Sequence, residues 1–345
     1  MADFRTDILI GHKEAERVHR QFDTRSRYLQ SGARIDVYRL AHDFGIPVVF
    51  RPLEGLLGVY VKDPAPGILL TTQRPESVQR LTCAHELGHH WLKHKVSYDD
   101  EGDVGIALGK ATGRVPPSER QADAFAFNLL MPRWLLVESI KHLRQLDLHL
   151  PDPVAVYQLA VRVGTSYMAC ALMLAKYNFI TSANLATLLT KQPKDIKARI
   201  LADVSMPDWH RDVWLLSQAD DGMAIETRQG DVLVAHVREA STAGYALETN
   251  GLTAAGFTVL ANREIATDAS PVADDPVGAI GAFPLCETVA LANQTGQAPF
   301  EIRQKRPWED NNGMSVVRLD VKVKLPSKGL SELDRAARMR AACAA

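Results

Sequence analysis

Two histidines four positions apart carry the clearest chemistry in this 345-residue chain. His85 and His89 frame the motif HELGH, and Glu86 follows the first of them. On a helix, residues four apart share one face, so the two imidazoles can bind a single ion. Glu86 is rotated by about 100° from His85, which brings its carboxylate within reach of a water on that ion. Two neutral nitrogens and a carboxylate base are the groups that a zinc hydrolase uses.

A helix over residues 75–94 must carry this motif. Its apolar and small residues recur at helical spacing and form the stripe that a buried helix needs: Leu81, Ala84, Gly88, Trp91 and Leu92. This stripe argues against the simpler interpretation, in which the two histidines lie on a solvated helix face.

Two histidines leave the metal in need of a third protein ligand. Glu119, near the start of the segment SERQADAFAFNLLMP, is our prediction for it. The small and apolar residues on its side of a helix over 118–131 suit a close approach to the histidine helix. Asp123, one turn later, either accepts the N–H of a ligand histidine and fixes its tautomer, or is the ligand itself. The acidic run at 99–103 is the weaker alternative and is more typical of a solvated loop.

Other residues of chemical interest surround the motif. His94 would lie about 180° from His85 on a continuous helix, so we predict that it cannot join the same site. We place His90 and His94 at the surface or behind the ligands, with His90 or Tyr98 as candidates for stabilising an oxyanion. Cys83 is typical of a small buried helix residue rather than of a redox switch.

The hydrophobic pattern predicts helices first and strands later. Helices are expected over 12–43, 75–94, 118–131 and 133–145, with several short ones over 152–190. Short strands punctuated by Pro and Gly are expected at 47–50, 58–61 and 67–71. Strands follow at 213–216, 223–226, 232–237, 257–260, 289–291, 301–304 and 315–325. Residues 331–345 are expected to form a loosely held terminal helix.

These segments resemble the ImmA/IrrE family of metallopeptidases over about residues 30–180. The resemblance rests on VYRLAHDFGIPVVFRPL at 37–53, TCAHELGHHWL at 82–92 and ERQADAFAFNLLMP at 119–132. It implies that His85, His89 and Glu119 bind Zn²⁺ and that Glu86 is the general base. It also implies limited proteolysis of a helix-turn-helix transcriptional repressor, in a stress or mobile-element response.

The same family commonly carries a helix-turn-helix-like segment, which here corresponds to 156–181 with Gly164 at the turn. A helix that reads DNA exposes Arg, Lys, Asn or Gln to the bases. The second helix, from Thr165 to Leu174, is instead almost wholly apolar. We therefore favour a packing or repressor-docking role and expect no direct DNA binding.

The second half of the chain resembles chagasin-type cysteine-protease inhibitors, which are immunoglobulin-like β-sandwiches. The matching segments are VLVAHVRE at 232–239, STAGY at 241–245, PVGAIGAF at 276–283 and RPWE at 306–309. Leu247 stands where the family has an aromatic residue, and the glycine-rich middle loop is missing from 261–275. We favour a domain for substrate docking or sensing over an inhibitor, with Trp308 as a candidate anchor.

Composition excludes several other classes of protein. With 46% hydrophobic and 23% charged residues, the chain is neither disordered nor fibrous. Its net charge of −1 divides into +4 over 1–204 and −5 over 205–345, far from the basicity of DNA-binding domains. The four cysteines form no CxxC pair, the N-terminus lacks an apolar targeting segment, and no run reaches 18 apolar residues. We expect a cytoplasmic protein with no membrane span.

The expected architecture has two principal domains. An α+β zincin-like metallopeptidase domain occupies 1–150, followed by a helix-turn-helix-like helical segment at 151–204. An all-β, immunoglobulin-like and chagasin-like sandwich spans 205–330 and leaves 331–345 as a terminal tail. The expected function is that of a zinc-dependent endopeptidase acting on a protein substrate, although a His₂-carboxylate set also accepts manganese. The alternatives are a non-catalytic antirepressor and a cysteine-protease inhibitor acting through the C-terminal domain.

Overall fold

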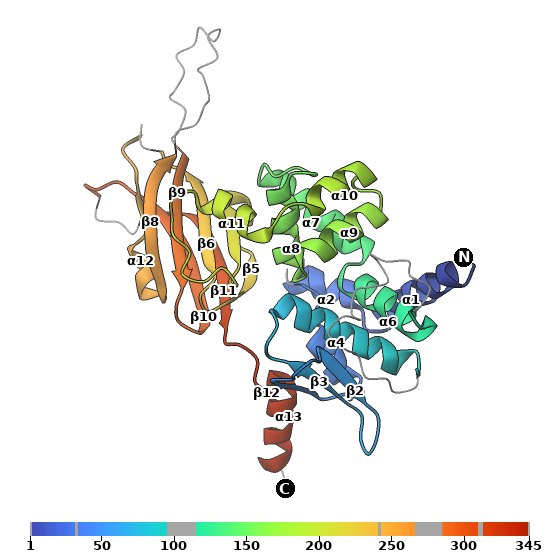
Figure 1. The fold of residues 1–345 in the computed structure, drawn as a ribbon. Helices are drawn as coiled ribbons and strands as arrows, with labels where there is room; N and C mark the ends of the chain where they lie inside the picture. Colours follow the sequence, from blue (N-terminus) through green and yellow to red (C-terminus); the bar gives the residue numbers. More distant parts are fainter. Residues whose placement is uncertain are drawn as a thin grey trace. The chain divides into compact units, whose positions relative to one another are not determined.

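The computed structural model describes residues 2–31, 34–94, 115–240, 243–265, 285–309 and 313–343 (Figure 1). The chain divides into two compact units. The first combines residues 1–143 and 149–191 with the C-terminal stretch 326–345, and the second comprises 144–148 and 192–325. The chain therefore leaves the first unit, builds the second, and then returns to the first.

Helices make up most of the first unit. They are α1 (Ala2–Gln21), α2 (Thr24–Ser31), α3 (Val37–Asp43), α4 (Glu76–Trp91), α6 (Pro117–Leu130), α7 (Arg133–Gln145), α8 (Pro153–Val163), α9 (Tyr167–Lys176), α10 (Ser182–Leu189) and α13 (Glu332–Cys343). The prediction of one helix over 12–43 was wrong. Asp23, with a φ of 45°, separates α1 from α2, and Asp36 starts α3 afresh by accepting a hydrogen bond from Arg39 N.

A four-stranded sheet in the first unit packs against α4. Its strands are β1 (Val48–Arg51), β2 (Gly58–Val61), β3 (Gly67–Thr71) and β12 (Gly329–Leu330), in the order β12-β1-β3-β2. β1 and β3 are parallel, whereas β2 and β12 run antiparallel to their neighbours. Because α4 contacts β2 and β3, the sheet supports the helix that carries the HELGH motif.

One buried carboxylate holds the C-terminal segment in the first unit. Asp334, which is 7% exposed, accepts from Val48 N at 2.9 Å and from Ser331 Oγ at 2.6 Å. It also meets His42 Nδ1 at 2.8 Å. We expected residues 331–345 to be a loosely held tail, but β12 pairs with β1 and α13 packs against α3. β12 has only two residues, which are too few to show the alternation of polar and apolar residues that predicts a strand. Its position in the sheet depends on these long-range bonds.

The helix-turn-helix-like pair is packed into the same unit. Gly164 ends α8 with a φ of 72°, and Ser166 caps α9 by accepting from Ala169 N. Arg80 of α4 is 2% exposed and donates to Gly164 O at 2.9 Å, which ties this turn to the motif helix. The buried residues of α9 are Tyr167, Ala169, Cys170, Ala171, Met173 and Leu174. The apolar sequence of α9 thus serves packing, as predicted.

Among the described residues, no single helix has both the length and the apolar composition to cross a membrane. α8 and α9 meet those two criteria only as a pair, with a bend of 102° between them.

The second unit consists mainly of strands, in two sheets of order β4-β6-β9-β8 and β5-β11-β10-β7. Its elements are α11 (Pro193–Leu201), β4 (Val213–Ser217), η1 (Gln218–Asp220), β5 (Ala224–Arg228), β6 (Val232–Arg238), β7 (Ala246–Glu248), α12 (Asn250–Ala254), β8 (Phe257–Ile265), β9 (Leu285–Ala292), β10 (Gly296–Lys305) and β11 (Met314–Lys324). The sheets face each other, because Phe257 of β8 and Phe300 of β10 pack edge to face with ring centroids 5.3 Å apart. The mixed α and β composition is confirmed, whereas the zincin-like and immunoglobulin-like details stay predictions.

Gly11 marks the closest approach between α1 and α6. A Cβ at this position would lie 2.7 Å from Ala124 Cβ and 2.7 Å from Phe125 N. Because backbone atoms cannot move aside cheaply, Gly11→Ala is expected to lower the free energy of unfolding by about 1–3 kcal/mol, despite the better helix propensity of alanine. Gly251→Ala is the matched control, since its Cβ would meet no atom within 4 Å. Urea unfolding followed by circular dichroism compares them, and equal midpoints would contradict this close packing.

Candidate metal centre

Helices α4 and α6 bring the three predicted metal ligands together. His85 Nε2, His89 Nε2 and Glu119 Oε2 form a triangle with sides of 3.0, 3.2 and 3.2 Å. All three side chains are buried. The triangle results from the four-residue spacing on α4 and from the place of Glu119 in the first turn of α6. The assignment of these residues as metal ligands stays a prediction.

Small residues let the two helices approach closely enough for this triangle. A Cβ on Gly88 of α4 would sit 3.2 Å from Ala122 Cα and 3.1 Å from Phe125 Cδ1, both on α6. Ala122 and Ala126 have no exposed surface. The glycine inside HELGH therefore sets the distance across which a carboxylate on α6 reaches both imidazoles.

Asp123 fixes the orientation of the first ligand histidine. Its Oδ1 lies 2.8 Å from His85 Nδ1, and both side chains are buried. A carboxylate accepts hydrogen bonds, so Nδ1 carries the proton and Nε2 turns its lone pair toward the triangle. Of the two roles considered for Asp123, the structure favours the one behind the histidine.

His94 lies behind the triangle, beside His89, which is one of the two places expected for it. α4 ends at Trp91 and Lys93 adopts a φ of 58°, so the chain turns back instead of continuing as a helix. His94 Nδ1 thereby lies 3.2 Å from His89 Nδ1, the ring nitrogen that does not belong to the triangle. On a helix continuing through residue 94, His94 would instead lie about 180° from His85. Burial lowers the pKa of His94, which favours its neutral ring.

The triangle suits a zinc ion. Two imidazole nitrogens and one carboxylate oxygen are a common protein set for zinc that leaves a fourth position open. Atoms bound at about 2.0–2.1 Å around a tetrahedral zinc lie about 3.3 Å from one another, close to the separations in the triangle. Burial alone would raise the pKa of Glu119, but contact with His85 and His89 holds it well below its ordinary value. Glu119 therefore presents a negatively charged carboxylate to the two imidazoles.

Glu86, the predicted general base, lies one residue after His85 in α4 and is 2% exposed. Helical geometry turns its side chain by about 100° from that histidine. Such burial removes bulk water from around the carboxylate and strengthens its interaction with nearby charges. Its catalytic role stays a prediction.

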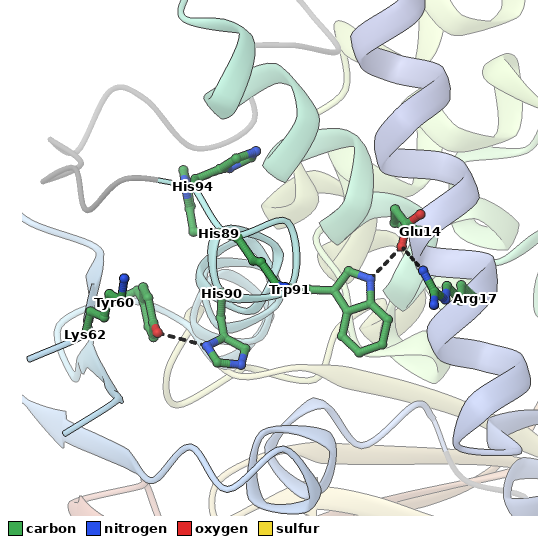
Figure 2. A pocket seen from close by; sticks show the side chains of 9 residues that line it. Glu14, Arg17, Tyr60, Lys62, His89, His90, Trp91 and His94 are labelled. Atoms are coloured by element: carbon green, nitrogen blue, oxygen red, sulfur yellow. Dashed lines mark hydrogen bonds and ion pairs between the residues drawn. The ribbon is translucent and has the colours of Figure 1, made fainter.

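A pocket of about 550 Å³ opens at the C-terminal end of α4. It is lined by Glu14, Arg17, Tyr60, Lys62, His89, His90, Trp91, Lys93 and His94. His90 Nδ1 lies 2.8 Å from Tyr60 Oη, and Trp91 Nε1 donates to Glu14 at 2.8 Å. Dashed lines mark both interactions in Figure 2. Sequence reasoning missed the pocket residues of α1 and β2, because they are far from the motif along the chain and no spacing relates them to it.

The inhibitor-like segments of the second unit are only partly described. Arg306 lies 4.6 Å from the centre of the Tyr245 ring, and Trp308 is 70% exposed. The segment 276–283 lies outside the described residues, as do Ser241 and Thr242. In the first unit, the same is true of Tyr98 and of the acidic run at 99–103.

Comparisons with known proteins bear on each half separately. No curated protein matches the chain. Among solved structures, a cysteine protease inhibitor from Entamoeba histolytica is similar at 18% identity with a TM-score of 0.26, and amebosin at 19% with a TM-score of 0.25. Each alignment covers 33% of this chain and 98% of the other. Residues 41–175, which include α4 and α6, match the IrrE N-terminal-like domain of the Peptidase_M78 family, and the resemblance to the ImmA/IrrE metallopeptidases is confirmed over them.

Proposed function

We propose that the chain is a zinc-dependent endopeptidase in which His85, His89 and Glu119 hold the metal and Glu86 is the general base. The observation that carries the proposal is the buried triangle of three electron-rich atoms, 3.0–3.2 Å apart. These separations match those among atoms that bind one tetrahedral zinc ion. The match of residues 41–175 to a metallopeptidase-type family supports the same conclusion.

The chemistry divides between the metal and the side chains around it. A bound zinc ion would supply a polarised scissile carbonyl and a more acidic water. Glu86 takes the proton that the attacking water loses and passes it to the leaving amine. His85 keeps its Nδ1 proton, which it donates to Asp123 in a hydrogen bond, and takes no part in this transfer. Glu119 contributes a full negative charge to the site.

The substrate that we propose is a regulatory protein, specifically a helix-turn-helix transcriptional repressor cleaved in a stress or mobile-element response. Support comes from the family resemblance, which extends over residues 41–175. The pocket beside His89 has a volume within the range of pockets that bind small groups, and it can receive a substrate side chain. We propose the cytoplasm as the compartment, where the four free thiols of the chain would stay reduced.

Metal content tests the ligand assignment directly. We expect about one zinc per chain in the purified protein and almost none in His89→Ala, because two remaining ligands bind zinc weakly. The control is His210→Ala, an exposed histidine of the second unit. Mass spectrometry measures the zinc content of all three proteins. In a separate test, removal of zinc from the wild type by a chelator should abolish cleavage until zinc is added back. Equal zinc in His89→Ala and in the control would contradict the assignment.

The alternative of a non-catalytic antirepressor makes a different prediction. Such a protein would bind the repressor without cutting it, so loss of the base at Glu86 would leave its effect intact. The inhibitor alternative is tested by titrating papain with the full chain.

A further inference from the structure

A chain of hydrogen bonds leads from the ligand His89 back to the N-terminal helix. His94 Nδ1 lies 3.2 Å from His89 Nδ1, and His94 Nε2 lies 3.1 Å from Gln121 Oε1. Gln121 Nε2 in turn donates to Asp7 Oδ1 at 2.7 Å. The chain joins the residues just beyond α4 to α6 and then to α1.

Asp7 is the fixed end of this chain. It is 6% exposed, and its Oδ2 accepts from Arg120 Nε at 2.9 Å and from Arg120 Nη2 at 2.6 Å. A carboxylate that forms a bidentate pair with an arginine accepts hydrogen bonds through its oxygens. Its second oxygen therefore requires a donor from Gln121.

That requirement determines the direction of every bond. Gln121 must turn its NH₂ group toward Asp7, which turns its carbonyl oxygen toward His94. His94 Nε2 must then donate, so Nδ1 of the neutral ring accepts. His89 Nδ1 must carry a proton, which leaves the Nε2 lone pair for the ligand triangle. The opposite direction would set two acceptors 2.7 Å apart between Gln121 and Asp7.

We propose that His94 is a positioning residue, which holds His89 in the tautomer and ring orientation that metal binding through Nε2 requires. The proposal rests on the ligand assignment made under the proposed function. It gives each ligand histidine its own acceptor: Asp123 directly for His85, and the Asp7–Gln121–His94 relay for His89. Acceptors behind a ligand histidine fix its tautomer and raise its basicity.

The anchor of the relay lies outside the part of the chain that matches a known family. That match begins at residue 41, whereas Asp7 is in α1. α1 thus contributes to the metal centre through one buried carboxylate, although it supplies no ligand.

Zinc affinity, measured on the full chain by competition with a chromophoric chelator, tests the role of His94. His94→Phe keeps an aromatic ring but removes the acceptor, and it is expected to weaken zinc binding by about 10- to 100-fold. His94→Asn returns an amide oxygen near the lost Nδ1 and is expected to recover most of that affinity. His90→Phe is the matched control, because His90 bonds Tyr60 instead. With folding verified by circular dichroism, equal zinc affinity of His94→Phe and the control would overturn the proposal.

Nitrogen-15 NMR of the histidine-labelled, zinc-free chain measures the tautomers themselves. We expect Nδ1–H on His89 and Nε2–H on His94. Gln121→Met breaks the link between His94 and Asp7 and is expected to let both tautomers of His94 become populated. This measurement needs no metal. If the wild-type chain bound no zinc, the proposed function would be wrong, but the histidine tautomers would still test the relay. An Nε2–H tautomer of His89 in the wild type would overturn the inference.

Discussion

Glu86→Gln is expected to retain one zinc ion per chain and to cleave the substrate about a thousandfold more slowly than the wild type. Glutamine has the shape of glutamate but cannot take up a proton at neutral pH. Because Glu86 is 2% exposed, bulk water cannot readily substitute for its carboxylate. The measurement is the rate at which a purified helix-turn-helix repressor is cut, followed by mass spectrometry of the fragments.

Two further measurements make this result specific. Glu76→Gln changes a carboxylate in the first turn of the same helix, where Glu76 pairs with Arg34, and should leave the cleavage rate near that of the wild type. Binding of the repressor to Glu86→Gln should persist. Wild-type cleavage by Glu86→Gln would exclude it as the base. Loss of zinc from that variant would show that the residue holds the metal instead.

Deletion of residues 326–345 is expected to lower the unfolding temperature of the first unit by about 10 °C or more. The deletion removes β12 from its pairing with Val49 and Phe50, and it removes α13 from α3. It also deprives the backbone N–H of Val48 of the Asp334 carboxylate. A buried donor that loses a charged acceptor costs about 1.5–3 kcal/mol, and the lost strand and helix packing add to this. Scanning calorimetry of the full and shortened chains measures the difference.

A single substitution separates the role of the carboxylate from that of the whole segment. Asp334→Ala keeps β12 and α13 in the chain and is expected to lose about 2–3 kcal/mol of stability. Arg338→Ala changes an exposed residue of the same helix and should unfold at the same temperature as the wild type. Unchanged melting of Asp334→Ala would mean that the bonds to Val48 and Ser331 do not hold the segment.

Local patterns were sufficient to predict the elements that carry the candidate site. The spacing in HELGH and the small residues after Glu119 predicted α4 and α6 to within three residues at each end. The sequence also predicted that His85, His89 and Glu119 come together, with Asp123 left as the alternative to Glu119, and the structure places one atom of each of the three within 3.2 Å of the others. Helical periodicity and short-range geometry determine these features, so they can be predicted from a single amino-acid sequence.

Features that depend on one backbone angle or on distant residues escaped prediction. The position of His94 follows from the left-handed conformation of Lys93, which no periodicity announces. The relay behind it needs Asp7, more than a hundred positions from Gln121. β12 is too short to show an alternating pattern, and it pairs with β1 across about 280 positions, as between Val49 and Leu330. Each of these is a long-range or single-residue effect that hydrophobic patterning does not encode.

The return of the chain to its first unit sets an order of events during synthesis. A ribosome reaches all four residues of the candidate centre by Glu119, but it makes Ser331 and Asp334 only after the whole of the second unit. The sheet of the first unit therefore stays without its fourth strand until residues 329–330 have been synthesised. A message cut short within the β domain would yield the HELGH helix without the segment that adds the fourth strand to its supporting sheet.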